Sequence, residues 1–172
     1  MKKAIAAGLA ATMLAATSLG FAGCSNEQTL REKYKDYFLI GATMSYGNFE
    51  TYEDIVDEFS SMTCENEMKW NNTEPKEGEF DFTMSDAMVE FAKEHDLSVR
   101  GHCIAWHNKD AIPDWVYEGG FDAARERLLN HATGVVSHFG DSIYAWDVWN
   151  EMLTDDTDED DTNLFRISYA DD

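Results

Sequence analysis

The chain has 172 residues, of which 44% are hydrophobic and 13% aromatic, and its formal net charge is -21 at pH 7. This length and composition suit one modest domain with a packed core and argue against a disordered chain. Such an acidic surface repels nucleic-acid phosphates and anionic membranes. It is compatible with an uncharged polymer such as a polysaccharide, although it does not by itself imply one.

Residues 1–23 have the pattern of a secretory signal peptide, with Lys2 and Lys3 ahead of an alanine-rich apolar run that ends in small residues. The run is short for a membrane span, so we exclude it from the fold. Ala22-Gly23-Cys24 resembles the end of a bacterial lipoprotein signal, which predicts an exported, cell-surface protein whose one membrane contact is a lipid on Cys24. Cleavage after Ala22 and secretion is the alternative. Residues 24–36 then form a polar tether to a domain of residues 37–172.

Apolar runs and segments with helical spacing alternate along this domain. The sequence predicts strands over 38–42, 61–64, 97–101 and 143–148. It predicts helices over 52–59, over 85–95 with Ser85 as the N-cap, and from an Asp122 cap to a stop at Gly140. Strands that alternate with helices indicate a parallel sheet with right-handed crossovers.

Polar side chains follow three of the predicted strands, beginning at Glu65, at His102 and at Asn150. Functional residues at the carboxyl ends of parallel strands are typical of a (β/α)8 barrel. Glu151 is the foremost catalytic candidate, because a carboxyl set against indole rings is partly desolvated and its pKa should rise towards that of a general acid. Taken alone, the stretch is better explained by a capping Asn followed by a solvated Glu.

Three segments together carry a resemblance to a known family: ENEMKW (65–70), RGH followed by WH (100–107) and WDVWNE (146–151). In this order they resemble the xylanases of glycoside hydrolase family 10, over roughly Tyr37 to Tyr169. The resemblance implies a (β/α)8 TIM barrel, of which this chain holds about the first four β/α units, since a complete barrel typically needs ~250 residues.

The resemblance also implies an activity, the retaining hydrolysis of internal β-1,4-xylosidic bonds in xylan. We expect no cofactor and no metal, since no Cys/His spacing matches a zinc site. Glu151 matches the family's catalytic acid/base. The residues that match sugar-binding positions are Glu65, Asn66 and Lys69 on the non-reducing side, His102 and Trp106 at the central subsite, and Asn150 at the 2-hydroxyl. The family's nucleophile lies in a Thr-Glu-Leu-Asp type motif, which has no match after Glu151, so the chain reads as an incomplete fragment. A non-catalytic, surface-anchored xylan-binding protein and an unfolded truncated product are the alternatives.

Several positions depart from the family pattern or leave two interpretations. Lys109 stands where the family usually has Gln, and Trp149 replaces a Val beside the catalytic carboxyl. Cys64 and Cys103 lie near the ends of adjacent predicted strands, where a disulfide is conceivable and two buried free thiols are favoured. The acidic cluster at 155–161 lacks the pattern of an EF-hand and is interpreted as a solvated loop.

Overall fold

The computed structural model describes residues 28–152. The predicted leader, the lipidation site Cys24, the acidic cluster at 155–161 and the segment that follows it lie outside these residues. The described part contains one parallel sheet with the strand order β1-β2-β3-β4. Its strands are β1 (Gly41–Met44), β2 (Ser61–Cys64), β3 (Ser98–Trp106) and β4 (Ile143–Asn150).

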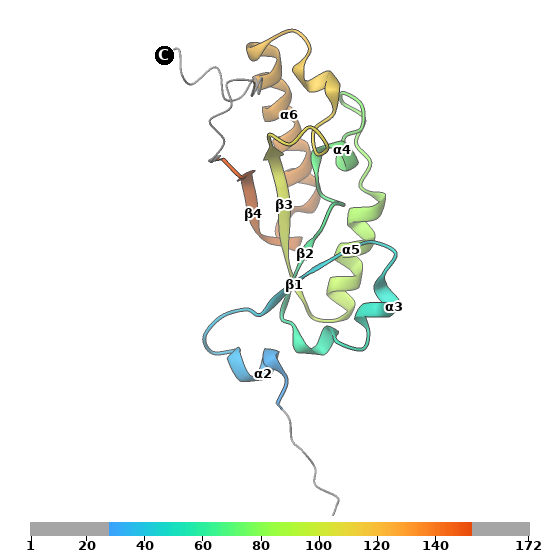
Figure 1. The fold of residues 1–172 in the computed structure, drawn as a ribbon, viewed down its shortest axis with the longest axis vertical. Helices are drawn as coiled ribbons and strands as arrows, with labels where there is room; N and C mark the ends of the chain where they lie inside the picture. The colour runs from blue at the N-terminus through green and yellow to red at the C-terminus, as the bar shows by residue number, and fades with distance from the viewer. Residues whose placement is uncertain (1–27, 153–172) are drawn as a thin grey trace, which may run out of the picture.

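Helical segments connect the strands and, in the case of α2, precede them. The α-helices are α2 (Leu30–Tyr34), α3 (Phe49–Tyr52), α4 (Trp70–Thr73), α5 (Thr83–Glu94) and α6 (Phe121–Phe139). The 3-10 turns are η1 (Val56–Glu58), η2 (Asp114–Tyr117) and η3 (Gly140–Ser142). The long helices α5 and α6 lie against the same side of the sheet (Figure 1). The short helices α2 and α4 lie near opposite ends of the sheet. The alternation is that of four consecutive units of a (β/α)8 barrel.

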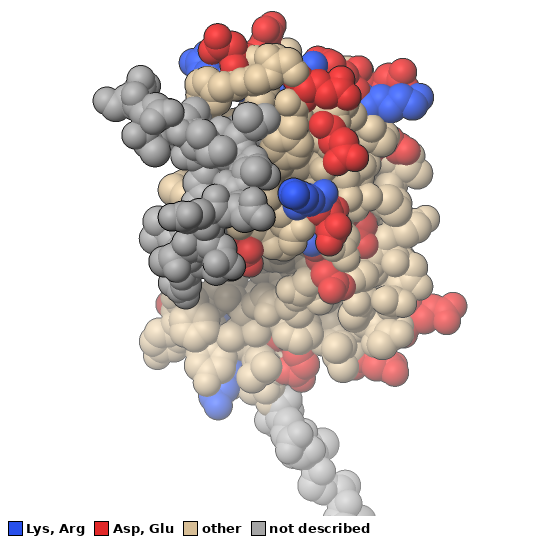
Figure 2. Space-filling model, turned by 45° about the horizontal axis from the view of Figure 1, so that its top comes forward, with Lys and Arg blue, Asp and Glu red and all other residues tan. Residues whose placement is uncertain are grey.

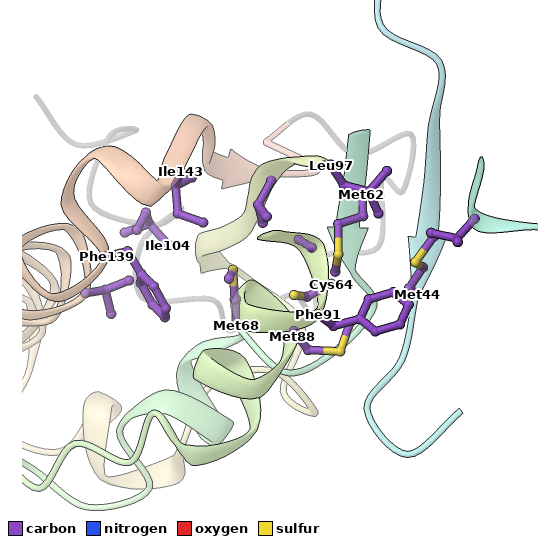
Figure 3. Packing of buried hydrophobic residues seen from close by; sticks show 14 residues of the cluster. Met44, Met62, Cys64, Met68, Met88, Phe91, Leu97, Ile104, Phe139 and Ile143 are labelled. Carbon is purple, nitrogen blue, oxygen red and sulfur yellow. The ribbon is translucent and has the colours of Figure 1, made fainter. Parts of the chain in front are cut away.

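The core lies between the sheet and the two long helices, and methionine and cysteine side chains form its centre beside β2. Met62 and Cys64 of β2 are fully buried, as are Met68 and Met88. Figure 3 shows these side chains gathered with Phe91 between strand and helix. Unbranched, flexible methionine fills irregular spaces between a twisted sheet and a helix. The packing fixes the sheet from one side only and leaves polar strand residues on the other.

A glycine in β3, Gly101, allows the ring of Trp146 to lie close to the strand backbone. A Cβ built on Gly101 would lie 2.2 Å from the ring of Trp146 on the adjacent strand. The Trp146 ring therefore lies across the β3 backbone and packs against the core on the helix side of the sheet. Only a residue without a side chain leaves room for it.

The strand predictions hold for β2 and for the start of β4, and fail at the ends of the other strands. The first strand is 41–44 instead of 38–42, because pairing in the register Gly41↔Ser61 begins only there. The third extends to Trp106, because β4 pairs with it as far as Trp106↔Asn150. Register with a neighbouring strand, and not local apolar content, sets these limits.

The helix predictions need three corrections. The stretch 52–59 holds only the end of α3 and the turn η1, and Ile55 in its middle is exposed. Ser85 is not a cap, because α5 begins at Thr83 and the Ser85 hydroxyl is buried and donates to the carbonyl of Phe82. Asp122 lies inside the first turn of α6, whose cap position is Gly120. The stop at Gly140 is confirmed, with a positive φ of 49° at that residue.

Candidate active site

The carboxyl ends of β3 and β4 and the segment after β2 bring most of the predicted site residues together. Parallel pairing places His102 opposite Asp147 and Trp106 opposite Asn150. The segment 65–69 leads from β2 into α4, which has its own contacts to β3. Residues far apart in the chain therefore share one edge of the sheet, as the barrel topology predicts.

Glu151 follows the last residue of β4 and contacts one indole. The indole Nε1–H of Trp106 donates to Oε2 of Glu151 across 2.7 Å. The backbone of Glu151 has a φ of 50°, a left-handed conformation that few residues other than glycine adopt. This bend turns the carboxyl out of the strand direction at the end of the sheet.

The sequence predicted that indole rings partly desolvate the carboxyl of Glu151. This prediction is wrong, because Glu151 is exposed in the described part of the chain. Two of the three nearby indoles turn away from it. Trp146 packs against the core between sheet and helices, and Trp149 packs against the buried cluster of Trp70 and Val116. Trp149 thus lies against the wall of the fold, and its substitution for the family's Val does not put a ring into the site.

Lys69 connects the β2 side of the site to Trp106. Its Nζ donates to Oδ1 of Asn66 across 2.7 Å and lies 4.9 Å from the centre of the Trp106 ring. An ammonium over an indole face is a favourable cation–π arrangement. The carbonyl of Asn66 also accepts a hydrogen bond from Nδ2 of Asn72 at 2.8 Å. Four predicted residues, Asn66, Lys69, Trp106 and Glu151, are therefore joined by direct contacts.

Glu65 and His102 lie on the polar side of the sheet. The hydroxyl of Ser45 donates to the exposed carboxylate of Glu65. His102 shares a hydrogen bond of 3.0 Å between its Nδ1 and Oδ2 of Asp147, and the His102–Cys103 peptide bond is cis. A cavity of about 380 Å³ opens between these side chains and is also lined by Arg100. Asn150 ends β4 at an intermediate level of burial, within one residue of Glu151.

Asp147 is a site residue for which the sequence predicted no role. Arg100 donates to its Oδ1 through Nε at 3.0 Å and also through its terminal nitrogen. Burial works to raise the pKa of Asp147, but hydrogen bonds and positive charge from Arg100 and His102 outweigh it and leave the pKa below its usual value. The signal for Asp147 was present, since it lies within the WDVWNE segment.

The two cysteines of the domain are buried free thiols, which confirms the favoured interpretation. Burial, helped by the charge of Glu67, raises the pKa of Cys64 to about 12. Burial also raises the pKa of Cys103 to about 11; the nearby Lys69 partly opposes this shift. Neither thiol is a reactive group of the site.

Lys109 lies in the exposed turn after β3.

Within residues 28–152 no group of His, Cys, Asp or Glu side chains is arranged to hold a metal ion. No helix of that same range is long and apolar enough to cross a membrane. Acidic side chains are spread over the face at the carboxyl ends of the strands, with few basic ones among them (Figure 2).

Parallel β/α units with a carboxyl, an amide, a lysine and an indole at their carboxyl ends have the arrangement of a (β/α)8 barrel protein, whose sites lie at that end of the strands. Residues 29–170 match the model of Glycosyl hydrolase family 10. The chain belongs to this family.

Relatives of known name agree with this assignment. A β-1,4-xylanase of Dictyoglomus thermophilum is 45% identical over 132 residues, which is 76% of this chain and 37% of the relative. The endo-1,4-beta-xylanase B of Paenibacillus barcinonensis is 39% identical over 137 residues, which is 76% of this chain and 41% of the relative. The chain therefore spans about two fifths of the length of these relatives.

A solved structure shows the same arrangement of strands and helices. Xylanase 10B of Thermotoga petrophila, in complex with xylobiose, superposes with a TM-score of 0.71 and 33% identity. The match covers 77% of this chain and 43% of that protein.

Proposed function

We propose that this chain supplies the acid/base carboxyl and the non-reducing-side sugar site of an endo-1,4-β-xylanase. The observation that carries the proposal is the contact between Trp106 and Glu151 beside the Asn66–Lys69 pair. Together they provide a carboxyl, an apolar ring, an amide and an ammonium at one edge of the sheet. Pyranose rings need such a set, because their faces are apolar and their hydroxyls require both donors and acceptors.

In the proposed reaction, Glu151 protonates the glycosidic oxygen as the xylosidic bond breaks. A second carboxylate, about 5 Å away in retaining enzymes, attacks the anomeric carbon, and Glu151 then takes the proton of the water that releases the sugar. Asp147 is unsuited to be that nucleophile, because Arg100 and His102 already occupy both of its oxygens. We infer that the nucleophile belongs to later strands of the barrel, since the matches cover only about two fifths of the relatives.

The other predicted residues have matching roles in sugar binding. Lys69 and Asn66 would donate to hydroxyls of the xylose units, and Glu65 would accept from them. Trp106 would offer the accessible part of its half-buried ring to the central sugar, next to His102. The acidic surface supports a neutral substrate, because it does not attract anionic polymers.

The test joins this chain to the later four units of the Thermotoga petrophila barrel and measures reducing sugar released from xylan. We expect the completed barrel to hydrolyse xylan and the Glu151→Gln variant to lose turnover by at least about 1,000-fold. The matched control, Glu50→Gln, changes an exposed carboxyl of α3 and should keep full activity. Turnover that survives Glu151→Gln would remove the acid/base assignment. Xylotriose binding without sugar release would favour a binding protein.

We further propose that the chain is exported and carries a lipid on Cys24. Lys2 and Lys3, the apolar run and the Ala22-Gly23-Cys24 sequence support this. Labelling with a fatty-acid analogue in a bacterial host should modify the wild-type chain and fail for Cys24→Ser. An intact mass that begins at Gly23 would show ordinary cleavage and secretion instead.

A further inference from the structure

A buried carboxylate lies directly behind the sugar site. Glu74 closes the single turn of α4 and is 3% exposed. Its Oε2 accepts from the indole Nε1 of Trp70 at 3.0 Å and lies 2.9 Å from Nδ1 of His131 on α6. Its Oε1 accepts from the backbone N–H of Gly78 at 2.8 Å. Three donors from three separate segments converge on one side chain.

The three donors match the hydrogen-bonding capacity of a carboxylate at Glu74. An ionised carboxylate offers only acceptors, so it can satisfy all three, provided that Nδ1 of His131 carries the hydrogen. Burial lowers the pKa of His131, although Glu74 opposes this shift, so the ring is held neutral with the proton on Nδ1. The ring also stacks on Trp70 with 4.1 Å between centroids and an angle of 10°.

Glu74 ends the helix α4, and the sugar-binding candidate Lys69 precedes the first residue of the same helix. Lys69 is the N-cap residue of α4, and its carbonyl accepts from the hydroxyl of Thr73 at 3.1 Å. Asn72 of the same turn donates to the carbonyl of Asn66 at 2.8 Å. A four-residue helix has too few internal hydrogen bonds to be stable alone. Its position, and that of Asn66 and Lys69, therefore depends on tertiary contacts, which are those of Glu74 at its end and the hydrogen bonds of Asn71 to the carbonyls of Asp110 and Ala111.

A second side chain of α6 contacts the loop between α4 and α5. Arg127, one turn before His131, donates through Nε to Glu77 at 2.9 Å. The side chain of Glu77 is 58% exposed, so this ion pair is largely screened by water. The contact of Glu74 with His131 is buried, and it adds a hydrogen bond to the packing of Trp70 against Ala124 of α6.

We propose that Glu74 and His131 are positioning residues of the sugar site, which hold α4 so that Asn66 and Lys69 face the sugar. The role in sugar binding rests on the proposed function, whereas the positioning of the segment does not.

The experiment uses the full 172-residue chain and measures amide hydrogen exchange. Glu74→Gln keeps the shape, but its NH2 group faces two donors if it takes the place of Oε2 and one donor if it takes the place of Oε1. We expect exchange over 66–73 to rise at least tenfold, while exchange in α5 changes less than twofold. Glu79→Gln is the matched control, because Glu79 belongs to the same loop but pairs with Lys76 in an exposed ion pair of 2.9 Å. It should change neither segment.

A milder variant decides the matter if Glu74→Gln does not fold. His131→Phe keeps a ring on Trp70 and removes one of the three donors, and it should raise exchange over 66–73 alone, by about threefold or more. A uniform rise across the chain, or no rise over 66–73, would overturn the positioning role.

Titration with xylotriose separates this role from the proposed function. If the wild type binds, Glu74→Gln or His131→Phe should weaken binding at least fivefold in step with local exchange, and Glu79→Gln should not. Unchanged binding despite faster local exchange would also overturn the proposal. A wild type that does not bind xylotriose would count against the proposed function, and the exchange data would still decide whether Glu74 and His131 hold α4.

Discussion

The indole N–H of Trp106 donates to Oε2 of Glu151 across 2.7 Å, and the same indole lies 4.9 Å from the ammonium of Lys69. One ring therefore contacts both the catalytic candidate and a sugar-binding candidate. Trp106 therefore holds the carboxyl of Glu151 in one direction at an exposed strand end.

Trp106→Phe should separate these two contacts, because phenylalanine keeps an apolar ring and lacks the N–H donor. A hydrogen bond typically contributes about 0.5–1.5 kcal/mol, of which the upper end corresponds to about tenfold in rate. We expect kcat of the completed barrel to fall roughly tenfold while KM changes less. Trp115→Phe removes an indole N–H that donates to the carbonyl of Pro75 at 3.2 Å and should leave kcat unchanged. A loss confined to KM would mean that the N–H has no part in catalysis.

Lys69→Met should weaken xylotriose binding about tenfold, since it removes the ammonium from Asn66 and from the Trp106 face while keeping much of the side-chain length. Isothermal titration calorimetry of the full chain measures the change. Lys76→Met makes the same replacement at an exposed lysine of the α4–α5 loop and serves as the control. Equal affinities for the two variants would contradict a sugar-binding role for Lys69.

Asp147→Asn should change how stability depends on pH. The folded-state pKa of Asp147 is depressed, so its ionised form adds stability above the unfolded pKa of about 3.9. This contribution disappears as pH falls through the folded pKa. The variant should therefore melt below the wild type at pH 7 and approach it near pH 2–3. Asp110→Asn, at an exposed turn, should melt like the wild type at every pH. A pH-independent difference for Asp147→Asn would mean that packing, and not charge, is lost.

Gly101→Ala should destabilise the fold by about 1–3 kcal/mol or more, because its Cβ would lie 2.2 Å from the Trp146 ring. Urea denaturation measures this loss. Gly41→Ala is the control in the same sheet, since its Cβ meets nothing nearer than the Ser61 carbonyl at 3.5 Å. Equal midpoints for the two variants would show that the Trp146 ring moves aside without cost.

Cys64 and Cys103 should resist alkylation in the native chain. Their raised pKa values, about 12 and about 11, keep the thiolate fraction at pH 8 near 0.1% or less, and both side chains are buried. Mass spectrometry after iodoacetamide treatment should find both thiols unmodified until urea is added, and no disulfide between them. Rapid labelling of either thiol without denaturant would contradict the burial.

Local patterns were sufficient to predict much of this protein. The alternation of strands and helices, the second strand at 61–64 and the helix stop at Gly140 follow from apolar spacing and from glycine's freedom at positive φ. The three polar segments at strand ends indicated the family, which the match over residues 29–170 confirms. Such features depend on neighbours in the chain, and the sequence displays them directly.

The tertiary structure alone decided which side chains meet. Glu74 and His131 are 57 residues apart, and nothing in either local pattern pairs them. The direction of Trp149, the extension of β3 to Trp106 and the exposure of Glu151 depend on strand register and on which faces the helices cover. Contacts of this kind are set by the packing of distant segments, so they appear only once the chain is folded.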